Sequence, residues 1–262
     1  MSFTGKTKAS TYKDILQVDN SNSGIDTSLR RIKDGEGTES SLYISDDQVR
    51  VFPVNDETTT TFSVRSKAGV TLFSVDSTNS LVKAGSTATS VNTQIHHFGI
   101  TSLMAAPSST NRWFALNSGG QGRTQISFTA GIGSTPDTSS TITSTADDLV
   151  SSIFYVPANI TIDSCNVWAG ADAASGDVIQ FSVMSYDIDT SNGSTGGDLS
   201  NGVENCVSPS TITSAGYEQA YYQDLTVSTA DVDAGKVIIA FIKSDGTNSD
   251  YSVNMNLVYH IR

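Results

Sequence analysis

Histidine and carboxylate side chains are the groups in this sequence that could bind a metal or transfer protons. His96 and His97 are adjacent, and neighbouring residues on a strand point to opposite faces, so one chain cannot direct both at one metal. One of them could meet its own copies on a three-fold axis and bind a metal there. The pattern favours ordinary packing or surface histidines, so we predict no metal site.

The segment from Asp187 to Asp198 resembles a calcium-binding loop. Asp187, Asp189 and Ser191 occupy the first, third and fifth positions, and Asp198 the twelfth. However, the glycine comes one place late, the last ligand is Asp instead of Glu, and no flanking helices are expected. These departures favour a solvated loop, with calcium binding as the open alternative.

Known catalytic motifs are not found in the sequence. It has no Gly-x-Ser-x-Gly, no His-Glu-x-x-His and no glycine-rich phosphate loop. Asp147 with Asp148, and Asp231 with Asp233, are carboxylate pairs by sequence, but glycoside hydrolysis depends on a spatial separation that the sequence does not provide. We therefore predict no enzymatic activity, no catalytic residues and no cofactor, with polysaccharide hydrolysis as a remaining alternative.

Aromatic residues near polar turns are better candidates for a binding surface. Trp168, Tyr217, Tyr221 and Tyr222 are of this kind, and their rings could stack on sugars or on the side chains of a partner. The alternative is that they pack in the core, as strand aromatics most often do.

Composition limits the classes of protein that these residues can belong to. The 262 residues are 37% hydrophobic, rich in Ser, Thr, Asn, Asp and Gly, and carry a formal net charge of −12 with a pI of about 4.4. Such a chain repels phosphate backbones, so we expect no nucleic-acid partner. No apolar run approaches the roughly 20 residues of a membrane-spanning helix, and the first ten residues lack the apolar core of a secretory signal. We expect a soluble protein made in a cytoplasm, with no membrane insertion.

Two cysteines, Cys165 and Cys206, are too few for a disulfide framework and lack metal-site spacing. Two reduced, buried thiols are the favoured interpretation, and a bridge between them is the alternative.

A doubled Phe-Ser-Val motif marks the stretch from Thr61 to Gly85. Apolar and polar residues alternate on either side of an Arg-Ser-Lys-Ala-Gly break, and Asp-Ser-Thr-Asn-Ser then turns the chain, as expected for short strands. The four threonines from Thr58 to Thr61 are β-prone and lead into it. A hairpin this poor in apolar residues must bury its face against something else, most simply further copies of itself. The residues predicted to pack around a trimer axis are Phe62, Val64, Leu72, Phe73 and Val75.

The first 50 residues contain no core of their own. Tyr12, Ile15 and Leu16 have a spacing that one or two helical turns could use, with Ser10 or Thr11 as the cap. A basic cluster follows, which is either a solvated face or a docking site for an acidic partner surface. Its members are Arg30, Arg31 and Lys33. Two short strands are expected around the Asp-Asp turn between Leu42 and Val51.

The remainder of the chain, from residue 93 to 262, has turn signals between short candidate strands, a pattern typical of a β-sandwich or jelly roll. The candidate strands are 95–100, 112–116, 125–128, 152–156, 161–168, 178–186, 211–213, 220–227, 237–242 and 251–259. The segment 237–242 is apolar throughout and should be the most buried strand. A short helix is expected at 145–152, capped by Thr145.

The N-terminal third resembles a known family of virion proteins. Residues 4–20 read Thr-Gly-Lys-Thr-Lys-Ala-Ser-Thr-Tyr-Lys-Asp-Ile-Leu-Gln-Val-Asp-Asn. Residues 34–49 read Asp-Gly-Glu-Gly-Thr-Glu-Ser-Ser-Leu-Tyr-Ile-Ser-Asp-Asp-Gln-Val, and the doubled Phe-Ser-Val block follows them. Over residues 4–95 these features are similar to tail-fibre and appendage proteins of marine podoviruses, the cyanophages and pelagiphages. The resemblance implies a virion protein, a homotrimer attached to the particle by its N-terminal part, with no catalytic motif to transfer.

Together these observations predict an all-β protein with three parts: an extended N-terminal virion-attachment segment (1–50), a short β-repeat stem (51–92) and a C-terminal β-sandwich, jelly-roll-like head (93–262). The expected function is that of a trimeric tail fibre in the virion whose head contacts the host surface, a glycan or a protein, and whose other partners are virion proteins of the tail or capsid. The alternative is a capsid fibre, decoration or tail adaptor-type protein with purely structural contacts.

Overall fold

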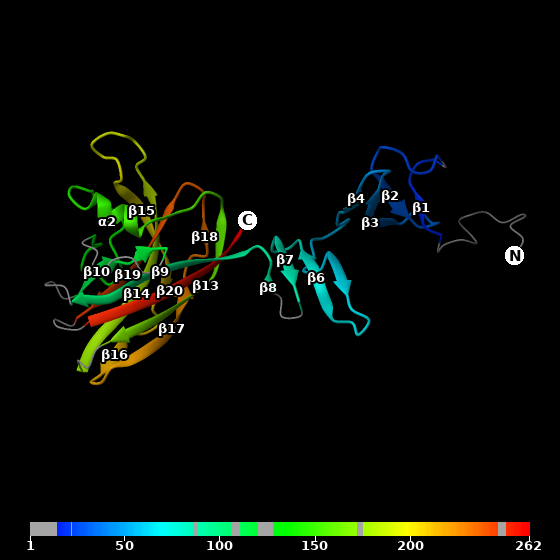
Figure 1. The fold of residues 1–262 in the computed structure, drawn as a ribbon. Helices are drawn as coiled ribbons and strands as arrows, with labels where there is room; N and C mark the ends of the chain where they lie inside the picture. The colour runs from blue at the N-terminus through cyan, green and yellow to red at the C-terminus, as the bar shows by residue number, and fades with distance from the viewer. Residues whose placement is uncertain are drawn as a thin grey trace, which may run out of the picture. The chain divides into compact units, whose positions relative to one another are not determined.

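The computed structural model of the protein describes residues 15–21, 23–85, 89–105, 111–119, 128–171, 175–245 and 250–262 (Figure 1). Strands make up nearly all of the regular structure in these ranges, in agreement with the all-β prediction, and α2 (Ala146–Ser152) is the helix that they contain. The chain divides into two units between Asn92 and Thr93.

The first unit begins with a small antiparallel sheet in the order β1-β2-β3-β4. Its strands are β1 (Gln17–Val18), β2 (Arg30–Lys33), β3 (Glu39–Ile44) and β4 (Val49–Val51). The expected hairpin is confirmed, because β3 and β4 pair with Leu42 opposite Val51. Among the described residues of this unit, Ile32 is the apolar side chain that becomes buried. The sheet therefore has almost no core.

The helical turn expected near Ile15 is wrong in its described part. Gln17 and Val18 pair as a strand with Lys33 and Ile32. Cross-strand pairing satisfies the backbone groups of this segment, which an isolated helical turn in water could not do. Tyr12 and the expected caps lie outside the described residues.

The second sheet of this unit holds the doubled motif, in the antiparallel order β5-β6-β7-β8, of which Figure 1 labels β6, β7 and β8. Its strands are β5 (Phe62–Arg65), β6 (Thr71–Asp76), β7 (Leu81–Ala84) and β8 (Thr89–Ser90). The Thr58 to Thr61 run precedes β5 as a turn and not as a strand. Its hydroxyls and backbone groups bind Ser77 at the end of β6, which closes the turn against the sheet.

The second unit is built on one twelve-stranded antiparallel sheet with the main path β10-β19-β14-β15-β17-β13-β20-β9-β11. Three short strands pair from the side, β12 with β19, β16 with β14 and β18 with β13. The strands are β9 (Thr93–Ala105), β10 (Arg112–Ala115), β11 (Asn117–Ser118), β12 (Phe154–Tyr155), β13 (Ile160–Ala171), β14 (Ser175–Ile188), β15 (Leu199–Val207), β16 (Ile212–Ala215), β17 (Gln219–Val227), β18 (Asp231–Val232), β19 (Val237–Ser244) and β20 (Asp250–Ile261).

This sheet nearly closes on itself, which refines the sandwich prediction. Its two end strands, β10 and β11, are separated in the chain by Leu116 alone, and they pair with β19 and β9 respectively. On the opposite side, β17 pairs with β13 along most of its length and with β15 through Thr226 and Val227. The two layers expected of a sandwich are thus joined at both sides, which leaves fewer open strand edges.

The apolar residues of the second unit form two clusters, one on each face of β19. Ile238, Ala240 and Ile242 point into the barrel-like interior. Val237, Ile239 and Phe241 point outward and are covered by the layer that contains α2 and by Trp113. All six residues of the run 237–242 are fully buried, which confirms the prediction for this strand. Its continuous apolar pattern follows from burial on both faces.

Most of the other expected strands are confirmed within a few residues, with two exceptions, and one long strand was not expected. Residues 125–127 lie outside the described part of the chain. Ser152 ends α2, so the strand expected from there shortens to β12. The strand β15 was not predicted, because Asn201 has a positive φ of 51° and the pairing with β14 contains two register shifts, which break the period-two pattern. The helix α2 was expected, but Thr145 forms no side-chain cap hydrogen bond.

Candidate functional site

The β5-β6-β7 sheet carries most of its apolar residues on one face. Cross-strand pairing places Phe62 opposite Val75 and Val64 opposite Phe73, and continues the same rows to β7. Paired residues in a sheet share a face. We call this surface the stem face, and its members are Phe62, Val64, Phe73, Val75, Val82 and Ala84.

The stem face is open to solvent in the single chain. Phe62, Val64 and Phe73 are 41%, 45% and 36% exposed, although all three are large apolar residues. The Phe62 and Phe73 rings meet edge to face with their centroids 6.3 Å apart. Leu72, which the sequence grouped with them, is the residue skipped by the register shift between β5 and β6 and is also exposed. The apolar side of this sheet is therefore available for contact with another surface.

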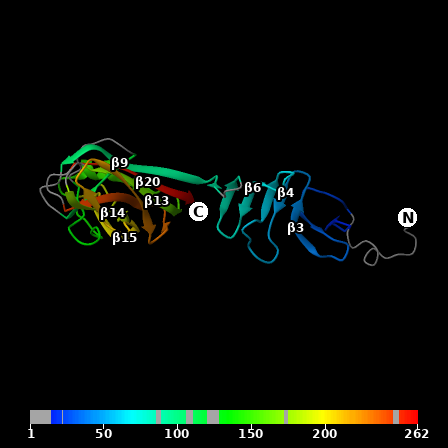
Figure 2. The same ribbon diagram turned by 90° about the horizontal axis from the view of Figure 1, so that it is seen from below.

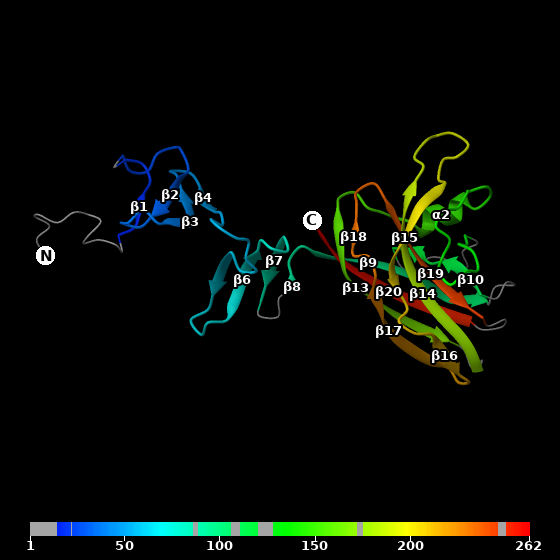
Figure 3. The same cartoon turned by 180° about the vertical axis from the view of Figure 1, so that it is seen from behind.

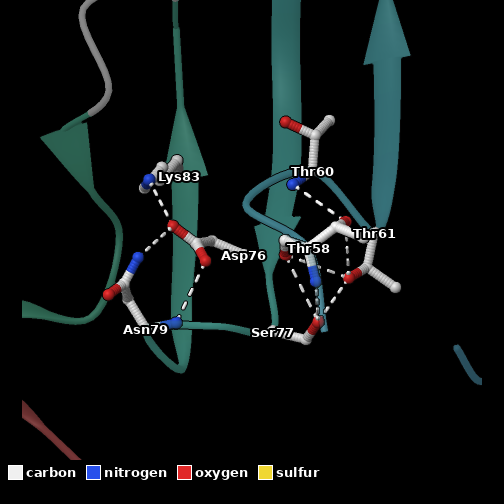
Figure 4. A network of polar contacts seen from close by, with 7 residues as sticks. All are labelled: Thr58, Thr60, Thr61, Asp76, Ser77, Asn79 and Lys83. Atoms are coloured by element: carbon white, nitrogen blue, oxygen red, sulfur yellow. Dashed lines mark hydrogen bonds and ion pairs between the residues drawn. The ribbon is translucent and has the colours of Figure 1, made fainter. Parts of the chain in front are cut away.

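The opposite side of the same sheet contains a buried carboxylate (Figure 4). Asp76 is 0% exposed, and its carboxylate accepts hydrogen bonds from the Lys83 ammonium at 2.7 Å and from the backbone and side-chain nitrogens of Asn79, each at 3.0 Å. Burial raises the pKa of Asp76, but these hydrogen bonds outweigh burial and lower its pKa to about 2. The carboxylate is therefore ionised at neutral pH and paired.

A second polar cluster lies beside the first (Figure 4). The hydroxyls of Thr61 and Ser77 lie 2.5 Å apart, and the hydroxyl of Ser77 also accepts a hydrogen bond from the backbone nitrogen of Thr58. Thr58 in turn accepts a hydrogen bond from the backbone nitrogen of Thr60 through its hydroxyl. Around Asp76 the sheet is thus inverted relative to an ordinary amphipathic sheet, with a charged group buried on one face and large apolar side chains exposed on the other. The sequence marked Asp76 only as a turn residue, and its Lys83 partner follows seven residues later without a recognisable signal.

The basic cluster on β2 is paired within its own sheet. Arg30 forms an ion pair with Asp26, Arg31 with Glu39, and Lys33 with Asp19 and Glu39. The Arg31 guanidinium also lies over the Tyr43 ring and donates a hydrogen bond to its hydroxyl. These intramolecular pairs reduce the charge available for an acidic partner. Ile15 and Leu16, which belong to the predicted virion-attachment segment (1–50), are exposed.

The four aromatic candidates of the second unit occupy different environments. Trp168 on β13 and Tyr222 on β17 are direct cross-strand neighbours with ring centroids 5.0 Å apart, and about half of each side chain is exposed. Tyr217 is exposed in the turn before β17. Tyr221 packs against the interior cluster, and its hydroxyl accepts a hydrogen bond from the backbone of Ala215. Tyr221 is therefore not placed for surface contact, because alternate residues of β17 face the core.

The two adjacent histidines have separate partners. His96 is half-buried, stacks on Phe154 at 4.0 Å between centroids and hydrogen-bonds the Ser118 hydroxyl. Burial, followed by the neighbouring His97, lowers the pKa of His96 to about 4. His97 is exposed and hydrogen-bonds Asn256. The two imidazoles thus occupy different environments, as their adjacency predicted.

The carboxylates of the calcium-like loop are also directed to separate partners. Asp187 pairs with Lys236, Asp189 accepts hydrogen bonds from Ser191 and Thr195, and Asp198 accepts one from the backbone of Ile142. Figure 3 shows the loop, in yellow, extending from the end of β14 to β15. Within the described part of the chain, no group of three or more His, Cys, Asp or Glu residues could hold a metal ion.

The remaining chemical candidates have structural contacts. Asp231 and Asp233 share the guanidinium of Arg262, so they do not form an isolated carboxylate pair. Asp147 and Asp148 lie in the first turn of α2, where negative charge interacts favourably with the helix dipole. Cys165 and Cys206 are free and buried in the interior cluster, which confirms the favoured interpretation.

No protein-family model and no curated protein matches this chain. No helix in the described ranges is long and apolar enough to cross a membrane.

Proposed function

We propose that the protein is a structural subunit of a bacteriophage particle: a tail fibre that associates as a homotrimer through its stem face, attaches to the virion by its N-terminal part and contacts the host surface with its C-terminal unit. The observation that carries this proposal is the inverted β5-β6-β7 sheet. It buries an ion pair and exposes two phenylalanines and a valine.

Burial of the stem face between copies is the simplest way to remove this apolar surface from water. Apolar surface contributes about 25 cal/mol per Å² when it is buried. A closed ring of identical chains buries the stem face of every copy equally, whereas an open arrangement would continue into filaments. The predicted three-fold arrangement also agrees with the resemblance of residues 4–95 to podoviral tail-fibre proteins.

The attachment role rests on that resemblance and on the lack of a core in the first sheet. A sheet with a single buried apolar residue, Ile32, gains stability if a partner covers it. The exposed side chains of Ile15 and Leu16 precede β1 and extend the surface that such a partner would contact.

Solution mass tests the proposal directly. The full chain, measured by light scattering over a range of concentrations, should have the mass of a trimer. The double variant Phe62→Ser/Phe73→Ser should need a protein concentration at least about a hundredfold higher than the unaltered chain to remain a trimer. The reason is that each copy loses two apolar side chains from the contact. The control Ile132→Ser/Val150→Ser removes two apolar side chains of the second unit that are more exposed than Phe62 and Phe73, and it should remain a trimer.

A chain that stays monomeric at every concentration would contradict the trimeric fibre and favour the decoration or adaptor role. The host-contact role has its own readout. Excess purified full chain should slow adsorption of the phage that carries it, and unchanged adsorption would remove that role.

A further inference from the structure

The strands β9, β20 and β13 lie side by side (Figure 2), and β17 pairs with β13. The outward side of these four strands carries two adjacent rows of side chains in register. The first row is Gly99, Asn254, Trp168 and Tyr222, and the second is His97, Asn256, Asn166 and Asp224. The rows are two residues apart on every strand and therefore share a face. We call these eight residues the amide–aromatic face.

The aromatic pair supplies a platform at one end of the first row. The Trp168 and Tyr222 rings are tilted by 52° and are 51% and 49% exposed, so neither is consumed by core packing. The π face of an aromatic ring is electron-rich and attracts positively polarised groups. The C–H side of a sugar ring presents such groups in a nearly flat arrangement that fits over an indole or a phenol.

The amides supply oriented donors and acceptors beside this platform. His97 donates to the carbonyl oxygen of Asn256 at 2.6 Å, and the amide nitrogen of Asn256 donates to Asn166 at 2.9 Å, which fixes the second row. The side chain of Asn254, next to Trp168, is exposed and forms no hydrogen bond with the described residues. Its acceptor and two donors can therefore bind hydroxyl groups. A few oriented polar groups beside an apolar platform are what ligand recognition requires.

Charge on the face selects against anionic ligands. Asp224 is its only carboxylate, and none of its eight residues is Lys or Arg. One oxygen of Asp224 accepts a hydrogen bond from the Tyr222 hydroxyl, and the other has no partner in the described ranges. A sugar hydroxyl can donate to this oxygen, whereas a carboxylated or sulfated sugar would be repelled by Asp224 and by the net charge of −12.

The approach to Trp168 along β13 is open on one side. A Cβ atom added at Gly170, two residues after Trp168, would have its nearest neighbours 3.9 Å away. The space at this position is therefore open. An extended ligand can therefore continue past the indole along β13 on the Gly170 side without meeting a side chain there.

We infer that the amide–aromatic face binds a neutral oligosaccharide, with one sugar ring stacked on Trp168 and Tyr222 and its hydroxyls bound by Asn254 and Asp224. This inference rests on the proposed host contact of the second unit and names its ligand class and location.

Calorimetric titration of the full chain with defined oligosaccharides tests the inference. The probes are cellotetraose, maltotetraose, mannotetraose and chitotetraose as neutral ligands and tetragalacturonate as an anionic one, each up to about 10 mM. At least one neutral probe should bind and the anionic one should not. Trp168→Ala and Asn254→Ala should each weaken that binding about tenfold or more. Gly170→Glu, which adds a charged side chain beside the indole in open space, should abolish it.

Tyr217→Ala and Tyr155→Ala are the matched controls, because both tyrosines are exposed and lie outside the face. They should bind like the unaltered chain. Light scattering on every sample separates this inference from the proposed fibre. A trimer that binds none of the neutral probes, or that binds them equally after Trp168→Ala, overturns the inference alone. Trp168→Ala that changes the oligomeric mass also overturns it, because the face would then be a contact between copies.

Discussion

Asp76 is an ionised carboxylate in a place that water does not reach. Its isolated transfer from water would be strongly unfavourable, and only the Lys83 ammonium and the two Asn79 nitrogens make its charged form stable there. Because all three partners lie in β7 or in the turn between β6 and β7, the ion pair specifies how these strands meet. The same contacts direct the alternate residues, Phe73 and Val75, to the other face.

The pH dependence of Asp76 is the first prediction at this scale. Its folded-state pKa of about 2 lies below the ordinary value of 3.8. Its stabilising contribution is therefore complete above about pH 4 and is lost as the pH falls toward 2. The carboxyl carbon shift of Asp76, followed by NMR, should titrate near 2. Lys83→Met should raise this midpoint, and a midpoint at or above 3.8 in the unaltered chain would contradict the buried ion pair.

The cysteines give a second prediction for single residues. The neighbouring Cys206 and burial raise the pKa of the Cys165 thiol well above its ordinary value. A thiol without access to solvent and with little thiolate reacts slowly. Neither cysteine should react with a water-soluble disulfide reagent at pH 8 in the folded chain, and both should react in denaturant. One fast-reacting thiol per folded chain would contradict the burial of both cysteines. Fewer than two reactive thiols after unfolding would contradict their reduced state.

At the scale of elements, β15 shows how an irregular strand is held. Its register against β14 shifts twice, and Gly202 lies where the two strands approach the segment at Thr138. A Cβ atom at Gly202 would lie 2.6 Å from Cε1 of Tyr186 and 2.8 Å from the Cα of Thr138. Tyr186 is fully packed in the outer cluster. This position therefore excludes any side chain because of packing, although its backbone conformation does not require glycine.

Replacing this glycine gives the prediction at the element scale. Gly202→Ala should destabilise the chain by about 1–3 kcal/mol, because the methyl group overpacks against a fixed ring and a backbone atom. Gly170→Ala is the control in a comparable strand, where the nearest atoms are 3.9 Å away, and should change stability by less than about 1 kcal/mol. Denaturant unfolding of both variants measures the difference. Equal midpoints for the two would refute the close packing at Gly202.

At the scale of the whole molecule, association has to overcome charge repulsion. Each chain carries a formal net charge of −12, so copies repel one another, and in the proposed trimer burial of the stem faces has to exceed this repulsion. Salt screens the repulsion over about 8–10 Å at physiological ionic strength and leaves burial of apolar surface intact.

This balance predicts the salt dependence of the trimer. Raising NaCl from about 10 mM to about 150 mM should lower the protein concentration at which the trimer dissociates, as measured by sedimentation equilibrium. Phe62→Ser/Phe73→Ser should dissociate more readily at both salt concentrations. Association that weakens with salt would mean that ion pairs between chains, and not the stem face, hold the copies together.

The sequence by itself determined the strands whose patterns are local. The run 237–242, the alternation in 251–259 and the Asp46-Asp47 hairpin follow from side-chain period and turn residues, and the all-β class follows from them. Trp168 and Tyr222 were predicted as surface aromatics from their residue types and are exposed, whereas Tyr221, grouped with them, packs against the interior cluster. Assigning alternate residues of 220–227 to two faces would have separated Tyr221 from Tyr222.

Only the tertiary structure decided the features that depend on distant partners. Closure of the sheet requires residues 112–118 to pair with both β19 and β9, and β15 becomes a strand only beside β14 and β17. The amide–aromatic face assembles residues from four strands between His97 and Asn256. Which face of β6 is buried was likewise decided by the Asp76 and Lys83 pair. Period and propensity describe one strand at a time, whereas strand order and register arise from contacts across the fold.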